Sequence, residues 1–177
     1  MAAAAGRVAA SDADDMPRHR GMPTPLEVYM SCPHTARPGH RIRKTLHPSA
    51  AIRRRSIITN SVLTAASLAA AGQTRVRILG GQLRGLTQAA VGPEAVETLS
   101  TLRVDVALLG ANGVSAAHGL STPDPDEATV KRAMVRSARQ VVALVDSSKI
   151  GQEHLVSFAS LDDVDLLVTD VELPPAR

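Results

Sequence analysis

From Ser56 onward, short apolar segments alternate with Ala-rich or amphipathic segments, and this alternation constrains the fold more than any other feature of the chain. β-branched and apolar runs predict strands at residues 56–60, 75–79, 88–91, 104–109, 140–145 and 166–169. Helices are predicted at residues 61–71, 93–102 and about 126–139, beginning at Ser61, Pro93 and an Asp126 cap. Continuous apolar strands joined through helices are typical of a parallel sheet that is covered on both faces. The predicted fold is therefore α/β, a doubly wound, mostly parallel, three-layer Rossmann-like sheet.

The predicted strands end in polar, glycine-rich loops. These loops are TNS at 59–61, GG at 80–81, GANG at 110–113 and DSSK at 146–149. In parallel α/β sheets, ligands bind outside the carboxyl ends of the strands. Glycines let a ligand approach the backbone, and Lys149 adds a point charge that suits phosphate. The alternative is that the glycines only end the strands and that Lys149 is solvated.

The first 55 residues differ from the rest in charge and pattern. They hold ten Lys and Arg against four Asp and Glu, a net charge of +6, whereas residues 56–177 hold ten against thirteen, a net charge of −3. They also hold six of the eleven prolines and show no sustained periodicity, so we predict a disordered basic tail. The alternatives are a targeting peptide, which three aspartates and the lack of an apolar core segment disfavour, a DNA-binding arm, and sequence that is not genuine coding sequence.

Rare residue types exclude several functions. One Tyr, one Phe and no Trp argue against a nucleic-acid module that stacks bases on aromatic rings. The single cysteine, Cys32, excludes an internal disulfide framework and a Cys-rich zinc site, and it fits a reducing cytoplasm. No apolar run approaches the roughly 18 residues of a membrane span. We therefore expect a cytoplasmic protein with no metal, no cofactor and no membrane partner.

Short blocks of residues follow one another in a specific order between residues 56 and 171. They are ITNS at 58–61, ILGGQLR at 78–84, VGP at 91–93, DVALLGANG at 105–113, GLST at 119–122, EATVKRAM at 127–134, DSSKIG at 146–151 and TD at 169–170. Each block alone carries little information. Together, in this order and at these spacings, they resemble the effector-sensing domain of DeoR-type transcriptional regulators.

The resemblance implies a fold shared with ribose-5-phosphate isomerase and CoA transferases, but without a catalytic role. It implies a domain that binds a phosphorylated sugar or similar metabolite and controls a DNA-binding helix-turn-helix in an oligomeric repressor of carbohydrate genes. The matched positions implied to line the pocket are Asn60, Gly80, Gly81, Gly110, Asn112, Gly113, Glu127, Lys131 and Lys149. Among them, Lys149 would suit a phosphate and Glu127 would suit sugar hydroxyls. The alternative for Glu127 and Lys131 is an i,i+4 pair on an exposed helix face.

Two features of the family have no counterpart in the sequence before Ser56. The family carries an N-terminal winged helix-turn-helix, and its sensor domain opens with a strand and an Asp-x-Gly-Thr-Thr-type phosphate loop. Residues 1–55 match neither pattern. We therefore expect a truncated member: a tail at 1–55, a sensor domain at 56–171 that lacks its first strand and phosphate loop, and a C-terminal tail at 172–177. Such a chain would contact DNA only through a helix-turn-helix from another chain or from missing sequence.

Two other functions are compatible with the sequence. One is a sugar-phosphate isomerase, in which Glu127 would be the base, because neither His118 nor His154 lies in a recognisable Ser/His/Asp or Cys/His arrangement. The other is an interaction fragment that pairs with full-length relatives. We expect a non-enzymatic sensor that forms homo-oligomers or pairs with family members.

Overall fold

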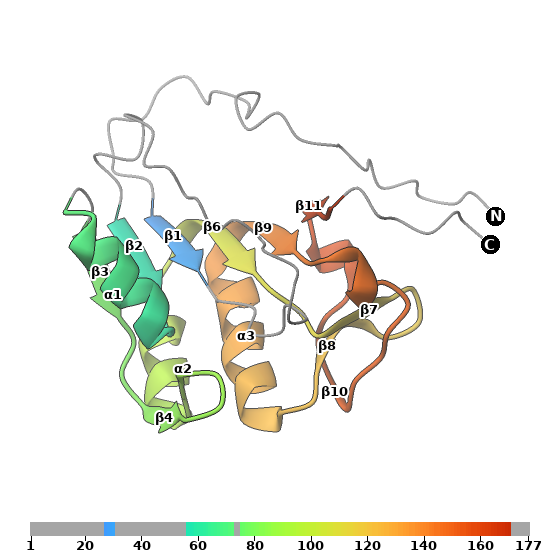
Figure 1. Cartoon of the computed structure of the whole chain (residues 1–177), viewed down its shortest axis with the longest axis horizontal. Helices are drawn as coiled ribbons and strands as arrows, with labels where there is room; N and C mark the ends of the chain where they lie inside the picture. The colour runs from blue at the N-terminus through green and yellow to red at the C-terminus, as the bar shows by residue number, and fades with distance from the viewer. Residues whose placement is uncertain (1–26, 31–55, 73–74, 171–177) are drawn as a thin grey trace, which may run out of the picture.

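A computed structural model describes residues 27–30, 56–72 and 75–170 of the chain, and for residues 27–30 it describes the backbone only. The described residues do not cover the rest of the predicted tail at 1–55 or the C-terminal tail at 172–177. They also do not cover the segment in which the phosphate loop is predicted to be absent. The domain combines parallel and antiparallel sheets with three α-helices within the described ranges (Figure 1).

A six-stranded sheet forms the centre of the domain, with the strand order β11-β9-β6-β1-β2-β3. Every neighbouring pair in it is parallel. Its strands are β1 (Glu27–Met30), β2 (Ser56–Thr59), β3 (Arg75–Ile78), β6 (Val104–Leu109), β9 (Ala138–Leu144) and β11 (Leu166–Val168). The parallel sheet that the alternating pattern predicts is therefore present.

Strand β1 corrects the expectation that the first strand is missing. It lies between β2 and β6, where Val28 is in register with Ile57 on one side and with Val106 on the other. Four residues are too few to show a strand period in a proline-rich segment. Pairing on both edges supplies the backbone hydrogen bonds that hold β1 extended, and this tertiary effect cannot be read from the segment itself.

Two smaller sheets flank the central one. A three-stranded antiparallel sheet has the order β10-β8-β7, built from β7 (Gly113–Ser115), β8 (Gly119–Thr122) and β10 (Val156–Ala159). A hairpin pairs β4 (Gln82–Arg84) with β5 (Ala89–Val91). The sequence pattern predicts only β5 among these five strands, because strands of three or four residues carry little periodicity.

The helices begin at residues that satisfy their first backbone N–H groups. Helix α1 (Val62–Ala70) begins after Ser61, whose hydroxyl accepts from the Thr64 N–H, and α2 (Pro93–Ser100) has Pro93 in its first turn. Helix α3 (Pro125–Ser137) is capped by Asp124, so the prediction of Asp126 as the cap is wrong. Pro125 takes the first helical position, where its missing N–H costs nothing, and this places the cap one residue earlier. Two 3₁₀ turns follow, at Ser147–Lys149 and Leu161–Asp163.

The apolar core surrounds the helices α2 and α3, which pack on one another (Figure 1), and includes residues of the central sheet and of the two smaller sheets. Leu99, Leu109, Leu120, Val130 and Met134 are all fully buried in it. Helix α1 packs on β2 and β3 instead and buries none of its nine residues. None of these helices has both the length and the apolar character that crossing a bilayer requires, within the ranges that the structure describes.

Candidate ligand-binding site

The polar loops predicted from the sequence lie at one edge of the central sheet. Strands β2, β3, β6 and β9 all belong to the central parallel sheet, so their carboxyl ends point the same way. Asn60, Gly80, Gly110 and Asp146 follow these ends directly or within two residues. The edge therefore carries the residue types that the sequence points to, and their contacts show what each can do.

Asn60 joins the end of β2 to the β4–β5 hairpin. Its Nδ2 donates to the Ala90 carbonyl at 3.1 Å, and the Ala90 N–H donates to the Asn60 carbonyl at 2.7 Å. Its Oδ1 is buried and accepts no hydrogen bond from the described residues. A buried amide oxygen without a donor costs about 1–3 kcal/mol. Asn60 Oδ1 is therefore a buried acceptor that the described residues leave without a donor.

The predicted site glycines differ in the space around them. A Cβ on Gly81 would collide with the Val91 carbonyl, and one on Gly113 would lie 2.9 Å from the Ser121 Oγ and closer still to the Gln152 carbonyl. These two glycines therefore allow close contact between backbone segments. Gly80 is exposed and has nothing within 4 Å of the place where a Cβ would lie. Gly110 is buried at the end of β6. Among these, Gly80 has the open space that a ligand needs.

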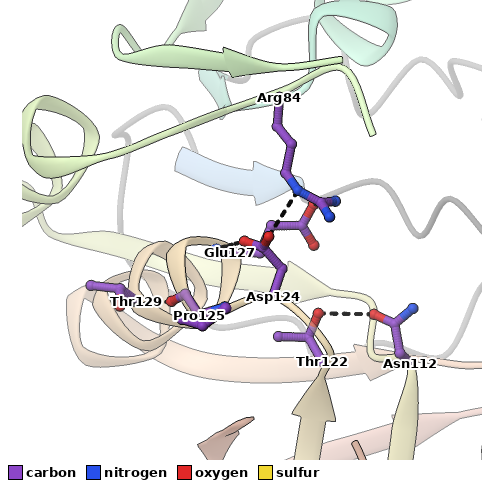
Figure 2. Close-up of polar contacts among 7 residues, drawn as sticks. All are labelled: Arg84, Asn112, Thr122, Asp124, Pro125, Glu127 and Thr129. Carbon is purple, nitrogen blue, oxygen red and sulfur yellow. Dashed lines mark hydrogen bonds and ion pairs between the residues drawn. The ribbon is translucent and has the colours of Figure 1, made fainter. Parts of the chain in front are cut away.

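Asn112 uses its side chain within the protein. Its Oδ1 accepts from the Thr122 hydroxyl at 3.1 Å (Figure 2). Its backbone N–H donates to the Ser121 carbonyl at 2.9 Å. Both contacts attach the loop after β6 to strand β8. The contribution of Asn112 that the structure records is therefore to hold this loop in place.

Four charged side chains gather where the hairpin meets the first turns of α3, and we call Arg84, Asp124, Glu127 and Lys131 the charged cluster. Arg84 Nε lies 2.9 Å from Asp124 Oδ2, and Arg84 Nη1 lies 3.0 Å from Glu127 Oε1 (Figure 2). The second Asp124 oxygen, Oδ1, accepts from the Glu127 N–H at 2.9 Å. The cluster thus joins two elements that are 43 residues apart in the chain.

Glu127 and Lys131 are buried, with 8% and 6% of their surfaces exposed. The alternative of a solvent-exposed i,i+4 pair is therefore wrong. Burial lowers the pKa of the Lys131 ammonium; the carboxylates of Glu127 and Asp124 oppose that change and the guanidinium of Arg84 adds to it. Lys131 Nζ also lies 5.2 Å from the centre of the Phe158 ring, at a cation–π distance. Paired, buried charges of this kind are frequent at functional sites.

Lys149 belongs to a different loop, at the end of the 3₁₀ turn after β9. Asp146 caps this turn by accepting from the Ser148 N–H at 3.1 Å, and Asp170 accepts from the Ser147 N–H at 3.1 Å. Lys149 itself is half-buried. The structure therefore groups Glu127 and Lys131 in the charged cluster and places Lys149 on a separate, firmly held turn at the carboxyl edge.

The predicted site residues do not include Arg84 or Asp124, although Arg84 ends the block at 78–84 and Asp124 lies between the blocks at 119–122 and 127–134. The signals that could have found them are an arginine three residues after a double glycine and an aspartate directly before Pro125. No group of three or more His, Cys, Asp or Glu side chains could hold a metal ion in the part of the chain that the structure describes.

A parallel sheet with helical crossovers, polar loops at its carboxyl edge and a partly buried charged cluster beside the start of α3 defines a class of protein, the α/β domain built on a parallel sheet. Comparison of the sequence identifies the family. The model of the "DeoR C terminal sensor domain" matches residues 45–171, so the chain belongs to the DeoR C-terminal sensor domain family.

The curated relatives are transcriptional regulators by name. The chain is 43% identical over 95 residues to the HTH-type transcriptional regulator GlpR of Haloferax volcanii, covering 54% of this chain and 37% of the relative. It is 37% identical over 115 residues to the HTH-type transcriptional repressor GlcR of Bacillus subtilis, covering 65% and 44%. It is 31% identical over 118 residues to the glycerol-3-phosphate regulon repressor of Escherichia coli, covering 67% and 47%. The chain therefore spans less than half the length of these relatives.

Proposed function

We propose that this sensor domain binds a phosphorylated sugar or a related phosphate ester and that binding controls the transcription of carbohydrate-metabolism genes. The observation that carries the proposal is the division of the carboxyl edge into two parts. Lys149 on its capped turn supplies a cation for a phosphate, and the buried charged cluster supplies fixed hydrogen-bonding groups for hydroxyls. The names of the relatives support it, since one of them is a glycerol-3-phosphate regulon repressor.

The proposed ligand contacts follow from the structure around each residue. Lys149 holds the phosphate, and Gly80 leaves room for the ligand to approach the backbone. Asn60 Oδ1 and the second carboxylate oxygen of Glu127 accept hydrogen bonds from hydroxyl groups. Gly81, Gly110, Asn112, Gly113 and Lys131 complete the proposed site, chiefly by shaping its walls.

We interpret the central sheet as doubly wound, with three layers. The connection from β2 through α1 to β3 runs toward one edge of the sheet, and the connection from β6 through α3 to β9 runs toward the other. If both crossovers are right-handed, as nearly all are, the two helices cover opposite faces. We propose residues 56–171 together with strand β1 as the sensor domain, and residues 1–55 and 172–177 otherwise as tails.

Regulation of DNA requires a DNA-binding part, which we propose is a helix-turn-helix supplied by another chain or by further sequence, as the names of the relatives imply. We propose that the domain acts in the cytoplasm as a homo-oligomer or paired with relatives. We propose no enzymatic role. The candidate base Glu127 has one carboxylate oxygen in an ion pair with Arg84, and the relatives are named as regulators.

Calorimetric titration of the full chain tests the proposal. The probes are glycerol 3-phosphate, fructose 6-phosphate, methyl phosphate and inorganic phosphate. Lys149→Ala should weaken binding of all four by about tenfold or more, because a charge-assisted hydrogen bond contributes roughly 1.5–3 kcal/mol. The matched control is Arg103→Ala, which removes an exposed cation next to the amino end of β6, the opposite edge.

Two results would contradict the proposal. One is that the wild-type chain binds none of the four phosphates. The other is that Lys149→Ala and Arg103→Ala weaken binding equally, which would show a general charge effect without a phosphate contact.

A further inference from the structure

Arg84 connects the β4–β5 hairpin to helix α3. It is the last residue of β4, and its guanidinium reaches two carboxylates near the start of α3, with Nε bonded to Asp124 and Nη1 to Glu127. The Arg84 side chain is 27% exposed, whereas that of Glu127 is 9% exposed. The ion pair therefore joins a partly exposed arginine to a buried carboxylate, and charge-assisted hydrogen bonds are strong where water is excluded.

The carboxylate of Glu127 is held from two sides. Asp124 Oδ1 accepts from the Glu127 N–H at 2.9 Å, which fixes the backbone, and Arg84 Nη1 contacts Oε1 at 3.0 Å, which fixes the side chain. Because Oε1 is taken by Arg84, Oε2 is the oxygen that remains for a ligand. The planar guanidinium holds both carboxylates in one fixed geometry, which a lysine ammonium could not reproduce.

The charges of the cluster balance. By formal charge, Arg84 and Lys131 are two cations, and Asp124 and Glu127 are two anions. A cluster without net charge gives little attraction to a phosphate, but its oriented oxygens and N–H groups can bond neutral hydroxyls. The cluster and Lys149 therefore recognise different parts of a phosphate ester.

We propose that Arg84 is a positioning residue that determines specificity: by holding Glu127, it makes the site prefer hydroxyl-bearing phosphate esters over phosphate groups alone. This inference rests on the proposed function of the site. Arg84 acts through Glu127 and does not touch the phosphate. Without Arg84, the Glu127 carboxylate is free to rotate or to pair with Lys131, and its acceptor is no longer presented in one direction.

The test compares fructose 6-phosphate with methyl phosphate, a phosphate ester without hydroxyl groups. The measured quantity is the ratio of the two Kd values, from calorimetry on the full chain. In the wild type, fructose 6-phosphate should bind at least tenfold more tightly. Arg84→Met should bring the two Kd values within about twofold of each other, because the loss of affinity falls mainly on fructose 6-phosphate. Arg84→Lys, which keeps the charge but not the fork, should retain only part of the preference.

A double variant separates positioning from a general structural role. If Arg84 acts through Glu127, then Arg84→Met added to Glu127→Gln should not change the ratio further, because the two substitutions remove the same interaction. The control is Arg103→Met, an exposed arginine outside the cluster, which should leave the ratio at its wild-type value. Circular dichroism melting of each variant checks that it is folded.

Different outcomes identify different errors. If Arg84→Met weakens methyl phosphate as much as fructose 6-phosphate, Arg84 is a phosphate ligand or a purely structural residue, and the inference is wrong. An unchanged ratio in Arg84→Met, or a further fall in the double variant, also overturns it. A wild type that binds both esters equally refutes the preference alone, whereas a wild type that binds no phosphate ester refutes the proposed function and this inference with it.

Discussion

Replacing Gly113 with alanine should destabilise the domain, because the new methyl group has no space. A Cβ at this position would lie 2.8 Å from the Gln152 carbonyl carbon and 2.9 Å from Ser121 Oγ, whereas ordinary contacts of a Cβ begin near 3.4 Å. The Gly151 N–H donates to the Val114 carbonyl at 2.8 Å and resists any separation of the two segments. Overpacking of this kind costs about 1–3 kcal/mol. Urea unfolding of the full chain should show this loss in the free energy of unfolding.

Gly80→Ala is the matched control, since Gly80 is also a glycine of the proposed site. Nothing lies within 4 Å of its Cβ position, and its φ is outside the left-handed region. Its free energy of unfolding should stay the same or rise by up to about 1 kcal/mol, because alanine restricts the unfolded chain. Gly113→Ala should also weaken phosphate binding. The new methyl group would displace Gln152, whose N–H donates to the Lys149 carbonyl. Equal stability of the two variants would refute the reasoning.

Two further predictions concern the charged cluster. Asp124→Ala should lower the free energy of unfolding by about 1–2 kcal/mol in urea titrations, because Asp124 caps α3 and pairs with Arg84. Asp126→Ala should change the free energy of unfolding by less than about 1 kcal/mol. A larger loss for Asp126→Ala than for Asp124→Ala would contradict the structure. Burial lowers the pKa of Lys131 in the folded chain, so the unfolded chain binds that proton more tightly, and Lys131 makes stability rise with pH between its folded pKa and 10.5. Lys131→Met should remove this rise, and identical pH profiles of unfolding for Lys131→Met and the wild type would show that Lys131 is not desolvated.

The longest elements of the domain can be predicted from sequence because each is long enough to show its own pattern. Strand β6 is six residues of nearly continuous apolar sequence, and α3 repeats its apolar residues at helical spacing over thirteen residues. Strand β1 cannot be found this way. Its four residues are ordered by pairing with β2 and β6, which are distant in the chain.

The candidate site is predictable in its location but not in its contacts. The polar loops after β2, β3, β6 and β9 lie at the carboxyl edge because parallel strands bring their carboxyl ends together, and this follows from the strand–helix alternation. Glu127 and Lys131, by contrast, could equally have faced solvent at i,i+4 spacing. Their burial depends on the packing of α3, which no local pattern reports.

The sequence by itself predicts the three helices and the strands β2, β3, β5, β6, β9 and β11, because hydrophobic periodicity is a local property. It also predicts that the polar loops share one edge, because a parallel sheet brings the carboxyl ends of its strands together. The short strands β4, β7, β8 and β10 are outside that prediction. The charged cluster was decided only by the tertiary structure. Arg84 meets Glu127 across 43 residues, because the β4–β5 hairpin folds back onto the start of α3, and the energy of that ion pair depends on the burial that the whole fold creates.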